Sequence, residues 1–192
     1  MEEDRVRRVV VAQTAHSWER IAAEEVVAAL AAAITENGRA TVALAGGNTP
    51  RPVYHRLASR LRKKVAWDKV EIFFGDERCV APESDESNFH MAYESLIEPL
   101  GLDAGKVHRI EGERDPEEAA RRYAAELEAV VGDPPRFDLV LLGLGEDGHT
   151  ASLFPATPDL APEGRWVFPT EAPVVPRHRL SLSLSVLNLA RR

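Results

Sequence analysis

The sequence predicts an α/β fold in which a doubly wound, mostly parallel sheet carries helices on both faces, as in Rossmann-like proteins. Strand-like and helix-like segments alternate along the chain. The strand-like runs at residues 70–74 and 137–142 are mainly apolar, as expected of parallel strands that are covered on both sides. Glycine-rich loops follow several of these runs, and such sheets bind ligands where their strands end.

The first elements follow from local signals. Residues 6–11 are a short β-branched run that predicts a strand. Residues 14–37 predict a long, Ala-rich helix, and Gly38 stands where a helix stop is expected. Residues 41–45 form the next apolar run and predict a second strand.

Further along the chain, capping residues mark where helices begin. Thr49 followed by Pro50 predicts a helix with a hydroxyl cap and proline at its first position. Ser87 can cap a helix that reaches residue 97, and residues 115–131 begin with a capping-box-like acidic turn. The alternation of Leu and Ser over residues 180–184 predicts a half-exposed strand.

Bulk composition narrows the function classes. A chain of 192 residues fits one domain, and its net charge of −7 argues against nucleic acid as a partner. An anionic substrate must therefore be held by local positive groups. The single Cys79 excludes an internal disulfide, and with the acidic N-terminus it predicts a cytoplasmic protein. The longest apolar run is too short to span a membrane. We also expect the protein to be a monomer.

Three strand ends carry unusual loops, at residues 45–50, 75–78 and 143–150. The carboxyl ends of parallel strands meet at one edge, so we expect these loops to converge there. In the first loop, Gly46 and Gly47 with Asn48 and Thr49 can cradle a phosphate at a helix start. The same residues are also compatible with an ordinary tight turn.

The second and third loops hold charged side chains. Arg78 can hold an anion or polarise a carbonyl, with Asp76 fixing its direction, or it can be an ordinary solvated ion pair. His149 shares its glycine-rich loop with Asp147, which favours a general base over a residue that merely caps the next turn.

Other residues have weaker signals. Arg177 and Arg179 can bind a phosphate, or they can lie in a basic surface turn. No histidine has metal-ligand spacing with another histidine or with the cysteine, so no metal is expected. No Gly-x-Ser-x-Gly elbow is present to support an acyl-serine mechanism.

Taken together, the strings 45–50, 75–80 with Ser87-Asn88, and 143–155 resemble those of 6-phosphogluconolactonases. Arg179 followed by alternating Leu and Ser, then Leu187-Asn188, is similar to the last motif of that family. The resemblance implies hydrolysis of 6-phosphoglucono-δ-lactone to 6-phosphogluconate in the oxidative pentose phosphate pathway, without a metal or organic cofactor.

The resemblance also implies roles for individual residues. His149 is the general base and Asp147 its neighbour, while Arg78 is a cation that faces the substrate. Gly46, Gly47 and Thr49 lie at the phosphate, and Thr150 is also expected to contact the substrate.

The chain departs from the family pattern at two places. Ala45 stands where the family usually has serine. Family members also continue past the Leu-Asn motif, so the resemblance implies one sugar-phosphate lactonase domain over residues 1–192 that lacks the family's C-terminal strand and helices.

Two alternative functions remain open. Glucosamine-6-phosphate deaminases have a similar Asp-Gly-His loop, but they carry a glutamate shortly after the histidine, where this chain has Ser152-Leu153-Phe154-Pro155. A sugar-phosphate sensor that binds without turnover is the other alternative. Such sensors usually carry a DNA-binding segment, and the chain has no basic helix-turn-helix signal.

Overall fold

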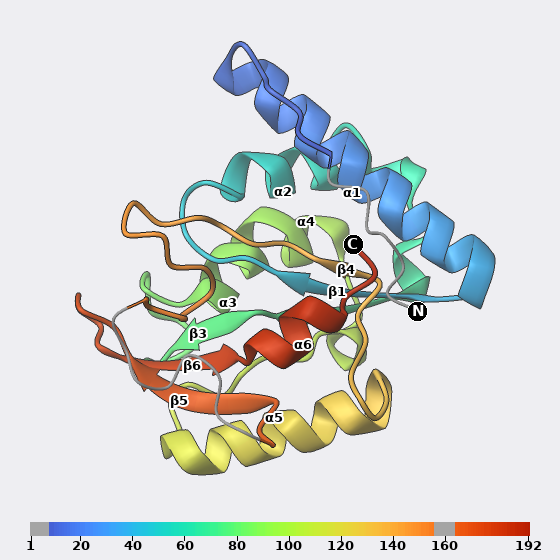
Figure 1. Ribbon diagram of the computed structural model, residues 1–192. Helices are drawn as coiled ribbons and strands as arrows, with labels where there is room; N and C mark the ends of the chain where they lie inside the picture. Colours follow the sequence, from blue (N-terminus) through green and yellow to red (C-terminus); the bar gives the residue numbers. More distant parts are fainter. Residues whose placement is uncertain (1–7, 156–163) are drawn as a thin grey trace.

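The computed structural model describes residues 8–155 and 164–192. Two three-stranded sheets lie side by side among the helices (Figure 1). One is parallel, with strand order β2-β1-β4, and the other is antiparallel, with order β3-β6-β5. Their strands are β1 (Ala40–Leu44), β2 (Val70–Phe74), β3 (Asp76–Arg78), β4 (Leu139–Val140), β5 (Val167–Glu171) and β6 (His178–Leu182).

Helices cover the sheets from both sides: in Figure 1, α1 and α2 lie above them and α5 lies below. The α-helices are α1 (Ala15–Asn37), α2 (Arg51–Ala58), α3 (Asn88–Ala92), α4 (Glu98–Leu100), α5 (Pro116–Val130) and α6 (Leu184–Leu189). A π-helical segment, η3 (Tyr93–Ile97), joins α3 to α4, and the 3₁₀ turns are η1 (Arg62–Lys64), η2 (Trp67–Lys69) and η4 (Ala104–Lys106). No helix of the described ranges is long and apolar enough to cross a membrane.

The α/β fold class is confirmed, and several predicted boundaries hold closely. Thr14 caps α1 by accepting from the backbone N–H of Ser17, and Gly38 ends the helix with a left-handed φ of 76°. Ser87 caps α3, and Asp115 caps α5 by accepting from the backbone of Glu118. These ends depend on short-range chemistry, which explains why the local sequence predicted them.

Four local predictions were wrong. The first is the strand predicted over residues 6–11, of which the structure describes residues 8–11. These residues form no strand, since no neighbouring strand pairs with them, and Val9 is 87% exposed. The strand expected over 137–142 is only β4, two residues long. The α2 helix begins at Arg51, and Pro50, which has no capping side chain, takes the cap position expected for Thr49.

The fourth wrong prediction is the half-exposed strand at 180–184. The corresponding strand β6 is the central strand of the antiparallel sheet, and its Leu and Ser side chains are all buried. Burial of Ser181 is tolerated because its hydroxyl donates to the carbonyl of Leu182 and accepts from the backbone of Ser152.

Gly75 connects the two sheets. Its N–H donates to the carbonyl of Leu44 at the end of β1, at 3.0 Å, and its carbonyl accepts from Leu182 of β6, at 2.9 Å. The chain therefore leaves the parallel sheet after β2 and enters the antiparallel sheet as β3 without an intervening loop. This junction places Asp76 at the carboxyl ends of the parallel strands.

At the opposite end of β2, a buried histidine links two carboxylates. His108 Nε2 lies 3.0 Å from Glu71 and Nδ1 lies 2.7 Å from Glu126, while the ring stacks on Phe73. Burial opposes the charged form, but the hydrogen bonds to Glu126 and Glu71 raise the pKa of His108. Lys106, 2.6 Å from Glu71, is the other cation of this cluster.

We expect His108→Gln to reduce the free energy of unfolding by about 1.5–3 kcal/mol at mildly acidic pH, the usual contribution of a charge-assisted hydrogen bond. Because the folded pKa of His108 is raised, its stabilisation is fully present below the ordinary histidine pKa and is lost as pH rises through the raised value. Urea unfolding at several pH values measures the difference. The exposed His55→Gln is the matched control, and a difference from wild type that grows with pH would contradict this assignment.

Candidate functional site

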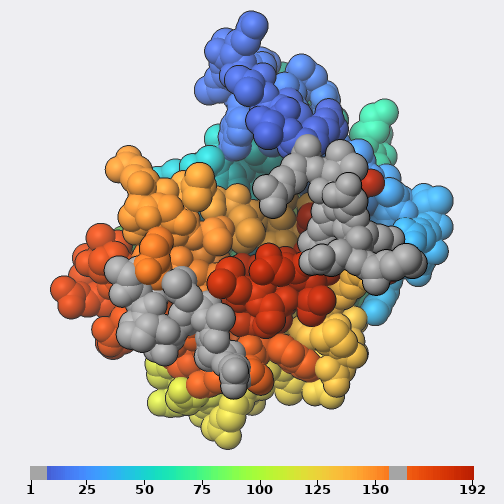
Figure 2. All heavy atoms as spheres, viewed as in Figure 1, coloured from blue at the N-terminus to red at the C-terminus, as the bar shows by residue number. Residues whose placement is uncertain are grey.

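A pocket of about 720 Å³ lies where the three parallel strands end. All three predicted loops contribute to its wall, so the structure brings them together as expected. The residues of these loops that line it are Ala45, Gly46, Gly47, Thr49, Pro50, Gly75, Asp76, Arg78, Gly143, Leu144, Gly145 and His149. In the space-filling view, the third loop (orange) lies between the blue helix α1 and the red C-terminal residues (Figure 2).

His149 and Asp147 form a hydrogen-bonded pair in the third loop. His149 Nδ1 lies 2.5 Å from Asp147 Oδ1, and the same oxygen accepts from the backbone N–H of His149. The hydrogen bond from the His149 side chain lowers the pKa of Asp147, which keeps this carboxyl ionised. An ionised carboxylate only accepts, so Nδ1 carries the proton and Nε2 is left as a proton acceptor.

The backbone of this loop makes room for the pair. A Cβ placed on Gly145 would lie 2.1 Å from His149 Nδ1 and 2.8 Å from Asp147 Oδ1, so only glycine fits there. Gly148 has a φ of 86°, which favours glycine for conformational reasons. The ring of Phe154 packs against the imidazole of His149, and the two ring centroids lie 4.7 Å apart.

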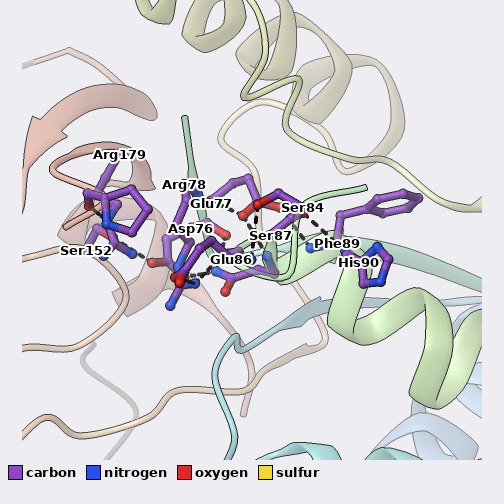
Figure 3. A network of polar contacts seen from close by, with 12 residues as sticks. Asp76, Glu77, Arg78, Ser84, Glu86, Ser87, Phe89, His90, Ser152 and Arg179 are labelled. Atoms are coloured by element: carbon purple, nitrogen blue, oxygen red, sulfur yellow. Dashed lines mark hydrogen bonds and ion pairs between the residues drawn. The ribbon is translucent and has the colours of Figure 1, made fainter. Parts of the chain in front are cut away.

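Asp76 lies at the sheet junction, held by donors from two directions (Figure 3). The Ser152 hydroxyl donates to Oδ2 at 2.6 Å, and the Asn88 amide donates to Oδ1 at 3.1 Å. Burial raises the pKa of Asp76, while the hydrogen bond from Ser152 and the positive charges of Arg78 and Arg179 oppose the rise. Asp76 is therefore a buried acidic group directly on the pocket wall.

Arg78 and Arg179 face each other across neighbouring strands, because β3 and β6 pair with these two residues in register. Arg179 is only 6% exposed, and its Nε donates to the carbonyl of Pro176. Burial and the charge of Arg78 lower the pKa of Arg179. Arg78 donates to the backbone carbonyl of Glu86 and lies 3.9 Å from its carboxylate.

Within the described residues, Arg179 forms no ion pair. Two guanidinium groups lie on the pocket wall, where they can attract an anion, although the carboxylates of Asp76, Glu77 and Glu86 offset part of the charge of Arg179. This arrangement supplies the local positive charge that a protein of net charge −7 requires to bind an anionic substrate.

Glu77, next to Asp76 in the sequence, points away from the pocket and serves the fold. Its carboxylate accepts from the backbone N–H groups of Arg78, Asn88 and Phe89 and from the Ser87 hydroxyl. It therefore caps the start of α3 and anchors that turn to β3.

Four of the predicted site residues do not line the pocket. Asp147 stands behind His149, and Thr150 closes the loop by donating to the carbonyl of Gly143. Asn48 is exposed at the tip of the first loop. Arg177 is exposed in the turn between β5 and β6, whereas Arg179 points into the pocket.

Sequence reasoning missed Asn88 and Ser152 as site residues. Both line the pocket and both bind Asp76. Asn88 belongs to one of the strings that carried the family resemblance, which was the available signal for it. Among the described residues, no group of three or more His, Cys, Asp or Glu side chains is arranged to hold a metal ion.

Comparison with known proteins shows the family of the chain. The family described as "Glucosamine-6-phosphate isomerases/6-phosphogluconolactonase" matches residues 13–192. A 6-phosphogluconolactonase of Synechocystis is 40% identical over 164 residues, which cover 83% of this chain and 66% of the relative. One of Treponema pallidum is 44% identical over 117 residues, covering 59% and 48%.

Solved structures show the same likeness. The crystal structure of 6-phosphogluconolactonase from Thermotoga maritima is 31% identical, with a TM-score of 0.81. The likeness covers 90% of this chain and 76% of that one. The chain spans between about half and two thirds of the length of the two curated relatives.

We expect Asp76→Asn to make the protein more stable at neutral pH while impairing the site. The folded pKa of Asp76 is raised, so folding stability falls as pH rises from the ordinary aspartate range through the raised value. The amide removes that loss, and the gain in melting temperature should shrink as pH is lowered. Calorimetry at several pH values measures it, with the exposed Asp68→Asn as control. A variant that is less stable at every pH would contradict this account.

Proposed function

Since the chain belongs to the glucosamine-6-phosphate isomerase/6-phosphogluconolactonase family, we propose that it hydrolyses 6-phospho-D-glucono-1,5-lactone to 6-phospho-D-gluconate. This reaction is a step of the oxidative pentose phosphate pathway. One observation carries the proposal: a histidine oriented by a carboxylate and a pair of arginines open onto the same pocket. Hydrolysis of a phosphorylated cyclic ester uses the histidine to activate water and the arginines to bind the anionic groups. We also propose that residues 1–192 form a single sugar-phosphate domain.

His149 is the proposed general base. Its Nε2 takes a proton from water as the water oxygen attacks C1 of the lactone, and a tetrahedral oxyanion forms. The imidazolium then returns the proton to the ring oxygen O5 as the C1–O5 bond breaks. One water is consumed, and the product is the open-chain acid. Asp147 keeps the imidazole oriented and stabilises its charged form, without itself taking the proton.

Arg78 and Arg179 are the proposed source of positive charge for the developing oxyanion and for the phosphate of the substrate. Arg78 faces the developing oxyanion, and Arg179 joins Gly46, Gly47 and Thr49 in holding the phosphate. Holding the phosphate at one end of the substrate positions the ester at the other, so that binding energy serves catalysis. Of the two arginines suggested by the sequence, the pocket position of Arg179 favours it over the exposed Arg177.

The deaminase alternative receives less support from the same loop. Where the deaminase carries its acid after the histidine, this chain places the apolar ring of Phe154 against His149. The sensor alternative does not explain why His149 and Asp147 are held in a proton-transfer geometry. Ammonia release from glucosamine 6-phosphate, with no acid release from the lactone, would favour the deaminase.

We expect His149→Asn to lower turnover by about 10²–10⁴-fold, the usual contribution of a positioned general base. Acid release from freshly prepared lactone, corrected for spontaneous hydrolysis, is the measurement. Binding of 6-phosphogluconate and the melting temperature should persist, because His149 lies in a partly exposed glycine loop.

The matched control for this variant is His178→Asn, since His178 is exposed and lies outside the pocket. A folded His149 variant that binds product and turns over at the wild-type rate would remove His149 as the base.

We expect the enzyme to prefer the phosphorylated lactone, and Arg179→Gln to reduce that preference by about tenfold or more. A charge-assisted hydrogen bond to the phosphate accounts for a loss of that size. The measured quantity is the ratio of kcat/KM for the phosphorylated and unphosphorylated lactones. Arg177→Gln should leave the ratio unchanged. Equal efficiency of the wild type on both lactones would remove phosphate recognition from the proposal.

A further inference from the structure

The Asn88 side chain connects two loops of the pocket that the proposed mechanism treats as separate. Asn88 is the first residue of α3 and is 2% exposed. Its amide lies between Asp76, in the second loop, and Gly46, in the first loop. All three residues line the pocket.

The orientation of this amide is determined by its partners. Nδ2 donates to two oxygens of Asp76, the backbone carbonyl at 3.0 Å and the carboxylate Oδ1 at 3.1 Å. Both partners are acceptors, so the nitrogen must be on that side. The amide oxygen Oδ1 therefore faces the other way, and it is buried without a hydrogen-bond partner.

Gly46 packs directly against the amide group of Asn88. A Cβ on Gly46 would lie 1.9 Å from Asn88 Oδ1 and 2.0 Å from its Cγ. No side chain larger than hydrogen fits between this loop and Asn88. Glycine is thus required at position 46 by close approach to a side chain, whereas Gly47 has a φ of 83° that itself favours glycine.

A role in the fold alone does not account for these contacts. The start of α3 is already capped by the Ser87 hydroxyl and by the Glu77 carboxylate. A buried acceptor without a partner is unfavourable, and a small apolar residue at position 88 would avoid it. An apolar residue at position 88 could not make the contacts that the Asn88 amide makes with the two pocket loops.

We propose that Asn88 is a positioning residue that holds the Asp76 carboxylate and the Gly46-Gly47 loop at one fixed separation. The inference rests on the proposed function, in which the loop holds the phosphate of the substrate. A sugar phosphate whose hydroxyl reaches Asp76 while its phosphate reaches the loop must match this separation. Asn88 thereby helps the pocket to select for the length of the phosphorylated sugar.

The first test removes the amide. Asn88→Ala should lower kcat/KM for the phosphorylated lactone by about 10²-fold, since a displacement of about 1 Å at a site has effects of that size. Efficiency on the unphosphorylated lactone should change much less, because that substrate does not use the loop. Ser87→Ala is the matched control: it weakens the same helix start without touching Asp76, so it should lower the melting temperature and leave the ratio of efficiencies unchanged.

A double-mutant cycle tests whether Asn88 acts through Asp76. In the Asp76→Asn background, adding Asn88→Ala should have a clearly smaller effect than in the wild type, because the two residues share one interaction. Effects that multiply independently would overturn the inference, as would an Asn88→Ala variant that keeps the wild-type efficiency ratio.

A complementation experiment needs no turnover and therefore separates this inference from the proposed function. Gly46→Ala should lower the melting temperature, because its Cβ overlaps the Asn88 amide. Combining it with Asn88→Gly removes the overlap, and the double variant should regain stability relative to Gly46→Ala alone while still binding inorganic phosphate more weakly than the wild type.

The outcomes that contradict the proposed function and those that contradict the role of Asn88 are distinct. A wild type without lactonase activity contradicts the proposed function. A Gly46→Ala variant as stable as wild type, or a double variant with wild-type phosphate affinity, contradicts the positioning role of Asn88.

Discussion

The backbone hydrogen bonds of Gly75 are the constraint on which the site depends. The N–H of Gly75 donates to Leu44 at the end of β1 and its carbonyl accepts from Leu182 of β6, so this residue joins the two sheets. The next residue, Asp76, is thereby placed beside the carboxyl ends of the parallel strands. Two positions later the antiparallel register sets Arg78 opposite Arg179. The acid and the cations of the pocket are consequences of this junction.

Burial of the Asp76 carboxylate lowers the stability of the fold and brings hydrogen-bond donors to this carboxylate. Ser152 and Asn88 come from distant parts of the chain, yet both donate to its carboxylate. Glu77, one residue further on, is buried as well, but its carboxylate accepts from the backbone at the start of α3, from the Ser87 hydroxyl and from the backbone of Arg78. Neighbouring acids thus have different roles because successive side chains of a strand point to opposite faces. Such placement of buried charge is typical of sites where function is favoured over stability.

Much of the fold could be predicted from the sequence because its signals are local. The caps at Thr14, Ser87 and Asp115 and the glycine stop at Gly38 depend on side chains within a few residues. The burial of β6 could not be predicted in this way, since the alternation of Leu and Ser is that of a half-exposed strand. Only the tertiary arrangement, with strands on both sides and Ser152 above it, shows that the serine face is covered.

In the site, too, some features follow from local sequence and others depend on tertiary contacts. The pairing of His149 with Asp147 lies within one loop, and its glycines and charges were visible in the sequence. That Arg179 lines the pocket while Arg177 is exposed follows from the strand pairing, which the sequence did not show. Asn88 was recognisable only as part of a motif. Its contact with Gly46 joins residues 42 positions apart and follows from no local pattern.

The cross-strand arginines also affect how the protein behaves in solution. Two like charges held side by side repel each other, and a small dianion bound at Arg179, the proposed phosphate position, relieves the repulsion and favours the folded state. On the proposed function, inorganic phosphate and sulfate in a buffer would compete for this position. The apparent affinity for a sugar phosphate would depend on the phosphate already present, which couples the pocket to the phosphate concentration of its surroundings.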